Sequence, residues 1–454
     1  MFTQETKRYI LDNIHKKSVK EIARDLNLKE RKIKRFLEEQ RKKEKKTRPA
    51  TETSPLVKKR RLVISIVLII SLGLAVYASS LGGKFLWDDS ILVRKNLYIR
   101  DWSNIGKLVS GDISTVSTVS DFKFYRPLQM ITYLADYSLW KLDERGYHIT
   151  NILIHILVAL SIYWLVNILY GDRLISLVTS LLFIAHPVHA GPVSYISGRS
   201  DSLGALFMLL SFIFYIKLVN KEKLGLYILM TLSYIASLLS RESSLILIAL
   251  VLLYHYSFKK KIRLRNLLSL LGATLAYTLL RVILLEGLVS HAPISTTFLE
   301  RLPGFFVAVT NYIKLLVFPF HIFHVEYGIG LFNFTNPRAI LGILILFSSL
   351  IYAFKKKDSN NLISFSICWF FIALLPVSNV FYPLNAYMAD NWLYIPSIGA
   401  FIIMAKLLTY LYKNKSFQIL SLFLAVSLLS TFSYLTIKEN GYFGEPIAFY
   451  KRIL

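Results

Sequence analysis

The chain has 454 residues, of which 54% are hydrophobic, and its formal net charge at neutral pH is +26. Its mean hydropathy of +0.48 excludes an ordinary soluble globular protein, which carries a smaller share of apolar residues. Apolar runs of roughly 17–25 residues recur along the chain, as a ~30 Å hydrocarbon layer requires. These runs are continuous rather than alternating, which argues against a membrane barrel. We therefore predict an all-α, polytopic helical membrane protein. The only cysteine, Cys368, excludes a disulfide framework.

The N-terminal 61 residues are strongly basic. They contain 21 of the 54 Lys and Arg residues and 9 of the 28 Asp and Glu residues, which is a net charge of +12. Positive residues beside a first span mark the cytoplasmic side and can contact anionic lipid headgroups. Because the segment is too long and too polar for a cleaved signal peptide, we expect residues 62–79 to be a retained span with the N-terminus in the cytoplasm.

Residues 1–50 are expected to form a small basic helical unit. The sequence SVKEIARDLNLKERKIKRFL, residues 18–37, resembles a helix-turn-helix, with apolar residues spaced to point inward. Ser18 can cap the first helix, Ala23 is small enough for a helix crossing, and Asn27 occupies the turn position where glycine is usual. Three interpretations stay open: a charged helical hairpin that fixes topology, a protein contact, and DNA recognition. A polar linker over residues 51–61 follows.

Hydropathy and the distribution of Lys and Arg predict about eleven membrane crossings. They lie near residues 62–79, 148–169, 173–187, 202–219, 224–240, 243–257, 266–286, 338–354, 361–380, 392–412 and 417–437. The basic connectors then lie in the cytoplasm and the loops with polar motifs lie outside. Residues 126–141 and 303–320 are expected to form helices along the outer surface. We predict a transmembrane domain over residues 62–437 and an outer tail over residues 438–454.

The tripeptide Trp87-Asp88-Asp89 follows the first span. Trp87 is typical of the interfacial belt, which would put both carboxylates at headgroup depth. Partial burial and the neighbouring negative charge raise the pKa of such a carboxyl group, so Asp88 or Asp89 is a candidate general base. The alternative is a solvated turn without a catalytic role.

A second polar cluster, IAHPVHAGPVSYISGRSD, covers residues 184–201 between two spans. His186 and His189 are candidates for a metal site, although their spacing alone is a weak signal. Arg199 is a candidate phosphate ligand because it begins a helix, and Asp201 follows two positions later. Alternatively, the cluster only caps the next span, and the histidines bond to the backbone.

Further polar residues occur in loops that the charge rule assigns to the same outer side. Arg241 and Glu242 form a tight turn, in which they either neutralise each other or leave Arg241 facing an anionic headgroup. The other residues of this kind are Arg126, His324, Glu326, Tyr327, Asp390 and Asn391. Because several such loops share one side, we expect a common cavity between a lipid substrate and a water-borne one.

No nucleotide-binding loop, metalloprotease motif or nucleophile elbow occurs in the sequence, and transporter-like broken repeats are absent. These absences argue against an ATPase, a protease and a carrier.

The order of these motifs resembles that of a known family. WDD, YRPL, YHITNILIH, HPVHAGPVSYISGRSD, SRE, LLVFPFHIFHVEYG and ADNWLYIPSIG follow one another within residues 62–454. This order resembles the GT-C membrane glycosyltransferases, and most of all the transmembrane-and-tetratricopeptide O-mannosyltransferases and their bacterial relatives.

The resemblance implies an inverting transfer of a sugar, with mannose as one option, from a polyprenyl-phosphate carrier to a hydroxyl group on the outer face. The acceptor would be a protein Ser or Thr, a glycan or a lipid, in the bacterial inner membrane or in a eukaryotic ER membrane. It implies that Asp88 or Asp89 is the base and that Arg126, Arg199 and Arg241 bind the donor phosphate. The implied pocket residues are Trp87, His186, His189, Asp201, Glu242, His324, Glu326, Tyr327, Asp390 and Asn391. The need for a divalent metal stays open, and nucleic acid is not an expected partner.

Two features depart from this family. The repeat array that would follow the last span is missing, with residues 438–454 resembling its beginning, and the basic N-terminal unit has no known counterpart. Two other functions stay open: a flippase or transporter of lipid carriers, and a membrane-tethered DNA-binding regulator that uses the N-terminal unit.

Overall fold

The computed structural model describes residues 2–14, 17–37, 55–110, 125–285, 296–320, 325–327, 331–384 and 386–453. Contacts divide the chain into two units, Met1–Ile64 and Ser65–Leu454. Regular structure in the described residues is almost entirely helical, which confirms the predicted all-α class.

The N-terminal unit consists of α1 (Gln4–Asn13), α2 (Val19–Asp25) and a further helix over residues 30–37. Ser18 caps α2 as predicted: its hydroxyl accepts from the Glu21 N–H, and the Glu21 carboxylate accepts from the Ser18 N–H. The three helices close over a small core made of Ile10, Ile22, Ala23, Ile33 and Phe36.

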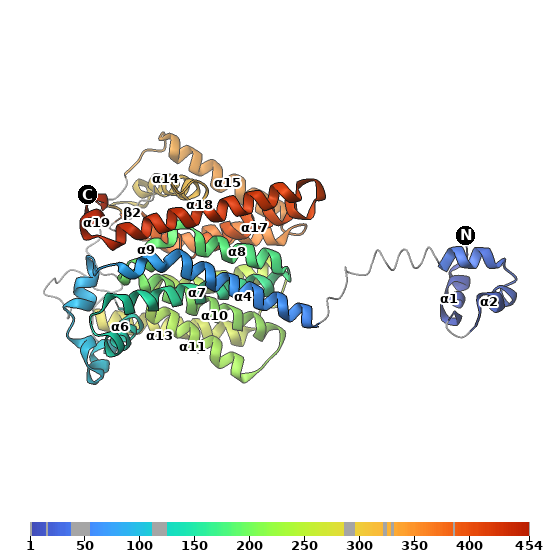
Figure 1. The fold of residues 1–454 in the computed structure, drawn as a ribbon, viewed down its shortest axis with the longest axis horizontal. Coiled ribbons are helices and arrows are strands. Elements are labelled where there is room, and N and C mark those ends of the chain that lie inside the picture. Colours follow the sequence, from blue (N-terminus) through green and yellow to red (C-terminus); the bar gives the residue numbers. More distant parts are fainter. Residues whose placement is uncertain are drawn as a thin grey trace. The chain divides into compact units, whose positions relative to one another are not determined.

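The larger unit is a bundle whose long helices run roughly along one direction (Figure 1). The helices are α4 (Pro55–Tyr77, which begins in the first unit), α7 (Glu144–Tyr170), α8 (Arg173–Ala185), α10 (Arg199–Asn220), α11 (Leu224–Ser240), α12 (Leu247–Phe258), α13 (Leu264–Leu285), α15 (Pro337–Lys356), α16 (Asn361–Leu374), α17 (Ser397–Lys413) and α18 (Gln418–Gly444). Shorter or transverse helices are α5 (Ile105–Ser110), α6 (Pro127–Trp140), α9 (Ala190–Ser194), α14 (Phe298–Val317) and α19 (Pro446–Ile453).

Each of the eleven predicted crossings coincides with a helix. Among the described residues, six helices are long and apolar enough to cross a membrane, or up to seven if the bent pair Arg173–Ala185 and Pro187–Ser194 is one span. The remaining expected crossings correspond to the shorter helices α11, α12, α16 and α17. The protein is therefore a multi-pass helical membrane protein.

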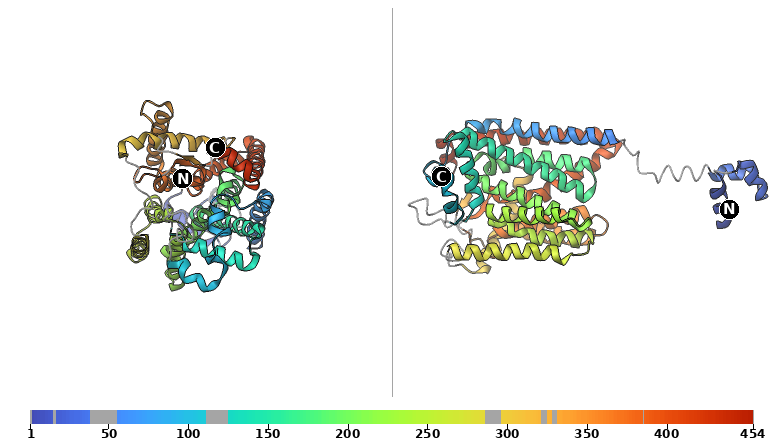
Figure 2. Two further views of the ribbon diagram at one scale, coloured as in Figure 1. Left: turned by 90° about the vertical axis from the view of Figure 1, so that its left-hand side faces the viewer. Right: turned by 90° about the horizontal axis from the view of Figure 1, so that it is seen from below.

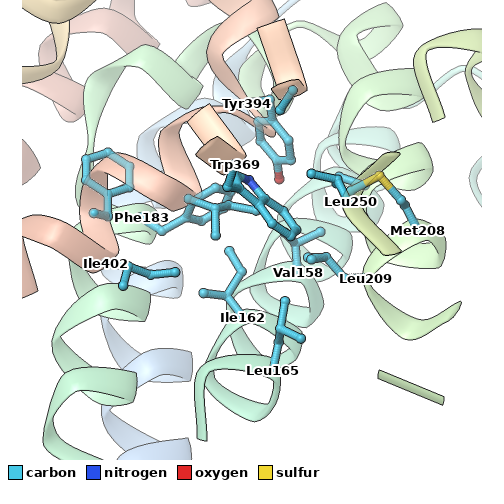
Figure 3. Packing of buried hydrophobic residues seen from close by; sticks show 14 of the residues in the cluster. Val158, Ile162, Leu165, Phe183, Met208, Leu209, Leu250, Trp369, Tyr394 and Ile402 are labelled. Atoms are coloured by element: carbon cyan, nitrogen blue, oxygen red, sulfur yellow. The ribbon is translucent and has the colours of Figure 1, made fainter. Parts of the chain in front are cut away.

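Burial differs strongly between the long apolar helices. In α10, 72% of the most apolar stretch is buried inside the protein, whereas in α13 only 11% is. A helix that is apolar on all sides lies either in a core or against lipid, so α10 is central and α13 faces the membrane. Figure 3 shows the core around Trp369, where side chains from α7, α8, α10, α12, α16 and α17 meet.

One end of the bundle carries the irregular segments. Figure 1 shows α6, α9 and α19 at this end, whereas the α7–α8, α10–α11 and α17–α18 connections lie at the opposite end. The left view of Figure 2 looks along the bundle, and α14, drawn in gold, lies across it. This transverse orientation is what the predicted surface helix over residues 303–320 requires.

Two loops and the C-terminal segment complete this end. The strands β1 (Val325–Tyr327) and β2 (Ala386–Ala389) pair in antiparallel fashion, with Glu326 opposite Met388. The segment predicted as a tail is continuous with the bundle, because the expected boundary between residues 437 and 438 falls inside α18. Asn440 joins this helix to the first span, since its side-chain amide donates to the Val76 carbonyl over 2.9 Å.

Candidate active site

The loop after the first span is fixed by Asp89. One carboxylate oxygen of Asp89 accepts from the Leu86 N–H at 3.0 Å, and the other accepts from the Ser197 N–H at 2.7 Å and from the Ser197 hydroxyl. The side chain of Asp89 is fully buried, and burial raises its pKa to about 7. Asp89 therefore ties this loop to the turn that precedes α10.

Trp87 holds an unusual backbone conformation beside this anchor. Its φ of 35° lies in the left-handed region, which a bulky residue rarely adopts. Its half-exposed ring lies 6.4 Å from the ring of Phe449 in α19. Backbone strain of this kind is concentrated at functional sites, and the assignment of Trp87 to the pocket region stays a prediction.

Asp88 lies in a more exposed environment than Asp89. It is only partly buried, and its N–H donates to the Tyr195 hydroxyl over 2.9 Å. Burial raises the pKa of the Asp88 carboxyl group above its ordinary value of 3.8, while a hydrogen bond with Tyr195 and the positive charge of Arg126 oppose that rise. Asp88 is thus a carboxylate with partial solvent access near a guanidinium group.

Arg126 precedes α6 and is held by Glu242. Its Nε and Nη2 donate to the two carboxylate oxygens of Glu242, at 3.2 and 2.8 Å, which is the fork geometry that arginine forms with a planar anion. Arg281 of α13 lies 3.9 Å from the same carboxylate. Glu242 therefore pairs with Arg126, which differs from the predicted alternative in which it only neutralises Arg241.

Arg241 begins the turn between α11 and α12 and contacts α10. Its Nη1 donates to Asp201 Oδ2 at 2.8 Å and to Ser200 Oγ at 2.9 Å. Arg126 Nη1 reaches the same Ser200 hydroxyl at 3.4 Å. The hydroxyl oxygen of Ser200 therefore lies between the guanidinium groups of Arg126 and Arg241.

We call Arg126, Arg241 and Arg281 the arginine cluster. Glu242 and Asp201 form ion pairs with this cluster, and the charge of Arg126 also acts on Asp88. The side chains of Arg126 and Arg241 are each 14% exposed, which leaves them accessible to a ligand. Partly buried guanidinium groups favour the binding of an anion, and phosphate suits the arginine fork.

A small pocket adjoins the arginine cluster. Its lining residues are Asp201, Arg241, Ser243, Ile246, Ala373, Val377, Asn391, Trp392, Tyr394, Ile395 and Pro396. The Asn391 side-chain amide donates to Asp201 Oδ2 at 3.0 Å, and the Asn391 N–H donates to Asp390 Oδ1 at 2.6 Å. Asn391 thus lines the pocket from the segment after β2, and the buried Asp390 lies directly behind it.

Strand pairing brings another predicted loop to the same end. Glu326 and Tyr327 lie in β1, which pairs with β2 directly before Asp390. Tyr312 of α14 supports this pair, since its hydroxyl bonds to the N–H and the carbonyl of Ala389, each over 3.2 Å. His324 lies outside the described residues.

Arg199 does not reach the pocket. It is fully buried, and its guanidinium group bonds to Asn151, Thr132, the Tyr147 carbonyl and, at 2.6 Å, the Asp136 carboxylate. It also lies over the ring of Tyr133, 4.6 Å from the centroid. The prediction that Arg199 binds the donor phosphate does not fit this geometry, because its donors are directed at protein atoms.

The two predicted histidines are also core residues. Both are fully buried. His186 bonds to the Leu316 carbonyl and accepts from the Val188 N–H, while His189 bonds to the Phe183 carbonyl and to Ser397 Oγ. Across the described ranges, no group of three or more His, Cys, Asp or Glu residues could hold a metal ion. The metal hypothesis for His186 and His189 therefore does not fit, whereas the alternative of backbone-bonded histidines does.

Five residues of this site escaped prediction as site residues. Tyr195, Ser197 and Ser200 belong to the predicted cluster 184–201 but carry no charge that would have marked them. Gly198 has a supporting role, because a Cβ atom there would come within 2.5 Å of the Gly191 carbonyl oxygen. Arg281 lies inside a predicted span, and an arginine at such a position is itself a sign of function.

Comparisons with known proteins find several protein O-mannosyl-transferases. The chain is 27% identical over 406 residues to a protein O-mannosyl-transferase of Caenorhabditis elegans. The alignment covers 85% of this chain and 57% of that protein. It is 25% identical over 421 residues to the human protein O-mannosyl-transferase TMTC3. This alignment covers 81% of the chain and 45% of that protein. The chain thus spans about half the length of these curated relatives. The resemblance predicted from the order of the motifs is confirmed.

No protein-family model matches the chain. Among solved structures, an oligosaccharyltransferase from Archaeoglobus fulgidus in the apo form aligns with 87% of this chain and 57% of its own, at 11% identity and a TM-score of 0.47.

Proposed function

We propose that this chain is a membrane glycosyltransferase that moves a sugar, with mannose as the first candidate, from a polyprenyl-phosphate donor to a hydroxyl group of an acceptor. The observation that carries the proposal is the arginine cluster beside a partly buried carboxylate, Asp88, at one end of a membrane-spanning bundle. The similarity to protein O-mannosyl-transferases over most of the chain supports the reaction class and the sugar.

In this reaction, Asp88 is the general base. Its carboxylate accepts the proton of the acceptor hydroxyl, whose oxygen attacks the anomeric carbon of the sugar. The bond between that carbon and the phosphate oxygen breaks, and the electron pair leaves with the polyprenyl phosphate. Attack from the side opposite the leaving group inverts the configuration. Asp89 acts as a positioning residue, because its oxygens are occupied by Leu86 and Ser197.

The leaving phosphate requires charge stabilisation rather than covalent attack. Arg126 and Arg241 are the proposed phosphate ligands, since both keep some exposure and share Ser200. Preorganised cations lower the barrier because they need no reorganisation when the negative charge develops. Asn391, Trp392 and Ser243 would then contact the sugar in the adjoining pocket.

The proposal is tested with the purified full chain and a labelled polyprenyl-phosphate mannose donor. Asp88→Asn should lower sugar transfer by about 100-fold or more, the usual contribution of a general base. Asp101→Asn is the matched control, because Asp101 is an exposed carboxylate in the same loop region. Normal transfer by Asp88→Asn would refute the assignment of the base. Translocation of the lipid without any glycosyl product would instead support a flippase.

The phosphate ligands have a separate test. Arg241→Gln should raise the donor KM or abolish donor binding, since the substitution removes a charge from the cluster. Arg100→Gln, an exposed arginine in the loop after the first span, is the control. Unchanged donor affinity in Arg241→Gln would remove Arg241 from the phosphate site.

A further inference from the structure

We infer that the N-terminal unit is a helix-turn-helix that binds duplex DNA, with the helix over residues 30–37 entering the groove. This function is independent of the sugar transfer proposed for the bundle. It rests on the backbone of the turn, on the separate core of the unit and on the charges that its surface presents.

The turn between α2 and the next helix has the required geometry. Asn27 has a φ of 49°, in the left-handed region that glycine usually occupies and that asparagine tolerates. The Leu28 N–H donates to the Ala23 carbonyl over 2.9 Å, which closes the C-terminus of α2. The absence of glycine at this position is thus no obstacle to a helix-turn-helix.

The core fixes which face of the helix over residues 30–37 is outward. Ile33 is fully buried and Phe36 is 8% exposed, so both point to α1 and α2. Four cations of this helix are exposed: Arg31, Lys32, Lys34 and Arg35. In a helix-turn-helix, the outward face of the second helix is the one that enters the major groove.

The first helix of the motif adds charge at its own surface. Lys20 and Arg24 are exposed and lie one turn apart on α2, where a helix-turn-helix crosses the phosphate backbone. Residues 2–37 contain 11 Lys and Arg against 5 Asp and Glu, a net charge of +6. Charge complementarity therefore favours a polyanion as the partner.

The surface of the unit favours DNA over an anionic membrane. Helices that bind a bilayer surface insert apolar side chains beside their cations. Among the residues of 2–37 whose side chains the structure describes, no large hydrophobic one is exposed. A convex helix that presents only polar groups matches a groove between phosphates better than it matches a flat lipid layer.

The test uses the full chain in nanodiscs of neutral lipid and a labelled 30-base-pair duplex, followed by fluorescence anisotropy. Binding should weaken steeply with salt, because each neutralised phosphate releases counterions. The triple variant Arg31→Gln, Lys32→Gln, Arg35→Gln should bind the duplex at least tenfold more weakly and with a smaller salt dependence. Lys259→Gln, Lys260→Gln, Lys261→Gln is the control, since it removes three exposed charges from the bundle instead.

Two results would overturn the inference. One is no salt-sensitive binding of duplex, or an equal loss in the triple variant and its control. The other is that the protein binds anionic vesicles but not duplex DNA, and that the triple variant loses this binding to vesicles. That result would assign the basic face to lipid. Because sugar transfer is measured separately, failure of this inference leaves the proposed function of the bundle untouched.

Discussion

Arginine residues that look alike in the sequence have different roles at the residue scale. Arg199 and Arg241 both flank apolar spans, yet Arg199 is fully buried among Asp136, Asn151 and Tyr133, whereas Arg241 keeps 14% of its side chain exposed. Burial decides the role, because a guanidinium group whose donors are all directed at the protein has none left for a ligand. Arg199 therefore holds α6, α7 and α10 together.

The first prediction concerns this ion pair. Arg199→Met should destabilise the protein by about 3–5 kcal/mol, because it leaves the buried Asp136 carboxylate without its partner. The measurement is the thermal unfolding midpoint in detergent, and Lys141→Met, at an exposed position beside α6, is the control. A stable Arg199→Met protein that no longer binds the donor would reverse the assignment and restore Arg199 as a phosphate ligand.

The second prediction concerns pH. Only the ionised Asp88 can accept a proton, and burial holds its pKa above 3.8. The kcat/KM of sugar transfer should therefore fall as the pH drops through this raised pKa, and the acidic limb should lie above the range of an ordinary aspartate. Asp89→Asn should lower the rate but keep an acidic limb. A profile that stays flat down to pH 4 would contradict the role of Asp88.

At the scale of elements, the transverse helix α14 supports the site through its contact with β2. Tyr312 of α14 holds β2 through Ala389, and Asp390 and Asn391 follow directly. The helix packs closely on α15, because Gly342 lets the backbone of Phe306 approach: a Cβ atom there would lie 2.0 Å from the Phe306 carbonyl oxygen. Small residues at such crossings are how membrane helices come close together.

The third prediction tests this contact. Gly342→Ala should push α14 away from α15, destabilise the protein by about 1–3 kcal/mol, as overpacking usually does, and weaken donor binding through the displaced β2 loop. Gly272→Ala in α13 is the matched control, because nothing lies within 4 Å of its Cβ position. The unfolding midpoint and the donor affinity are measured together. An unchanged midpoint in Gly342→Ala would mean that the two helices are not in tight contact.

At the scale of the whole bundle, the polar site and the basic connectors lie at opposite ends. The Asp88 loop, α6, α9 and α19 are at one end, and the α7–α8, α10–α11 and α17–α18 connections are at the other (Figures 1 and 2). Since positive loops stay on the cytoplasmic side, we propose that the site opens to the outside.

The fourth prediction follows from this polarity. In a Cys368→Ser background, which removes the only native thiol, Asp101→Cys should react with a membrane-impermeant thiol reagent added outside intact cells. Lys260→Cys, in the basic α12–α13 connection, should react only after the membrane is opened. The reverse pattern of labelling would place the site in the cytoplasm and exclude an outer-face reaction.

The sequence was sufficient for features that depend on local pattern. Each of the eleven predicted apolar runs lies on a helix of the described residues, and six or seven of these helices are long and apolar enough to cross a membrane. Such runs are readable from the sequence because hydropathy over one span is a local property. The surface helix over residues 303–320 was predicted from the charge rule, and the helical N-terminal unit from the spacing of Ile22, Leu26, Leu28, Ile33 and Leu37. The order of short motifs identified the relatives.

Only the tertiary structure decided which polar residues share a pocket and which are buried. Asp201, Arg241 and Asn391 come from three separate parts of the chain, and their contacts depend on how the helices pack. The structure also buries Arg199, His186 and His189 in the core, and it gives Asp88 and Asp89 different exposures and hydrogen-bond partners. A sequence records which groups are polar, but desolvation and hydrogen-bond partners are properties of the packed helices, and they determine which groups remain available for chemistry.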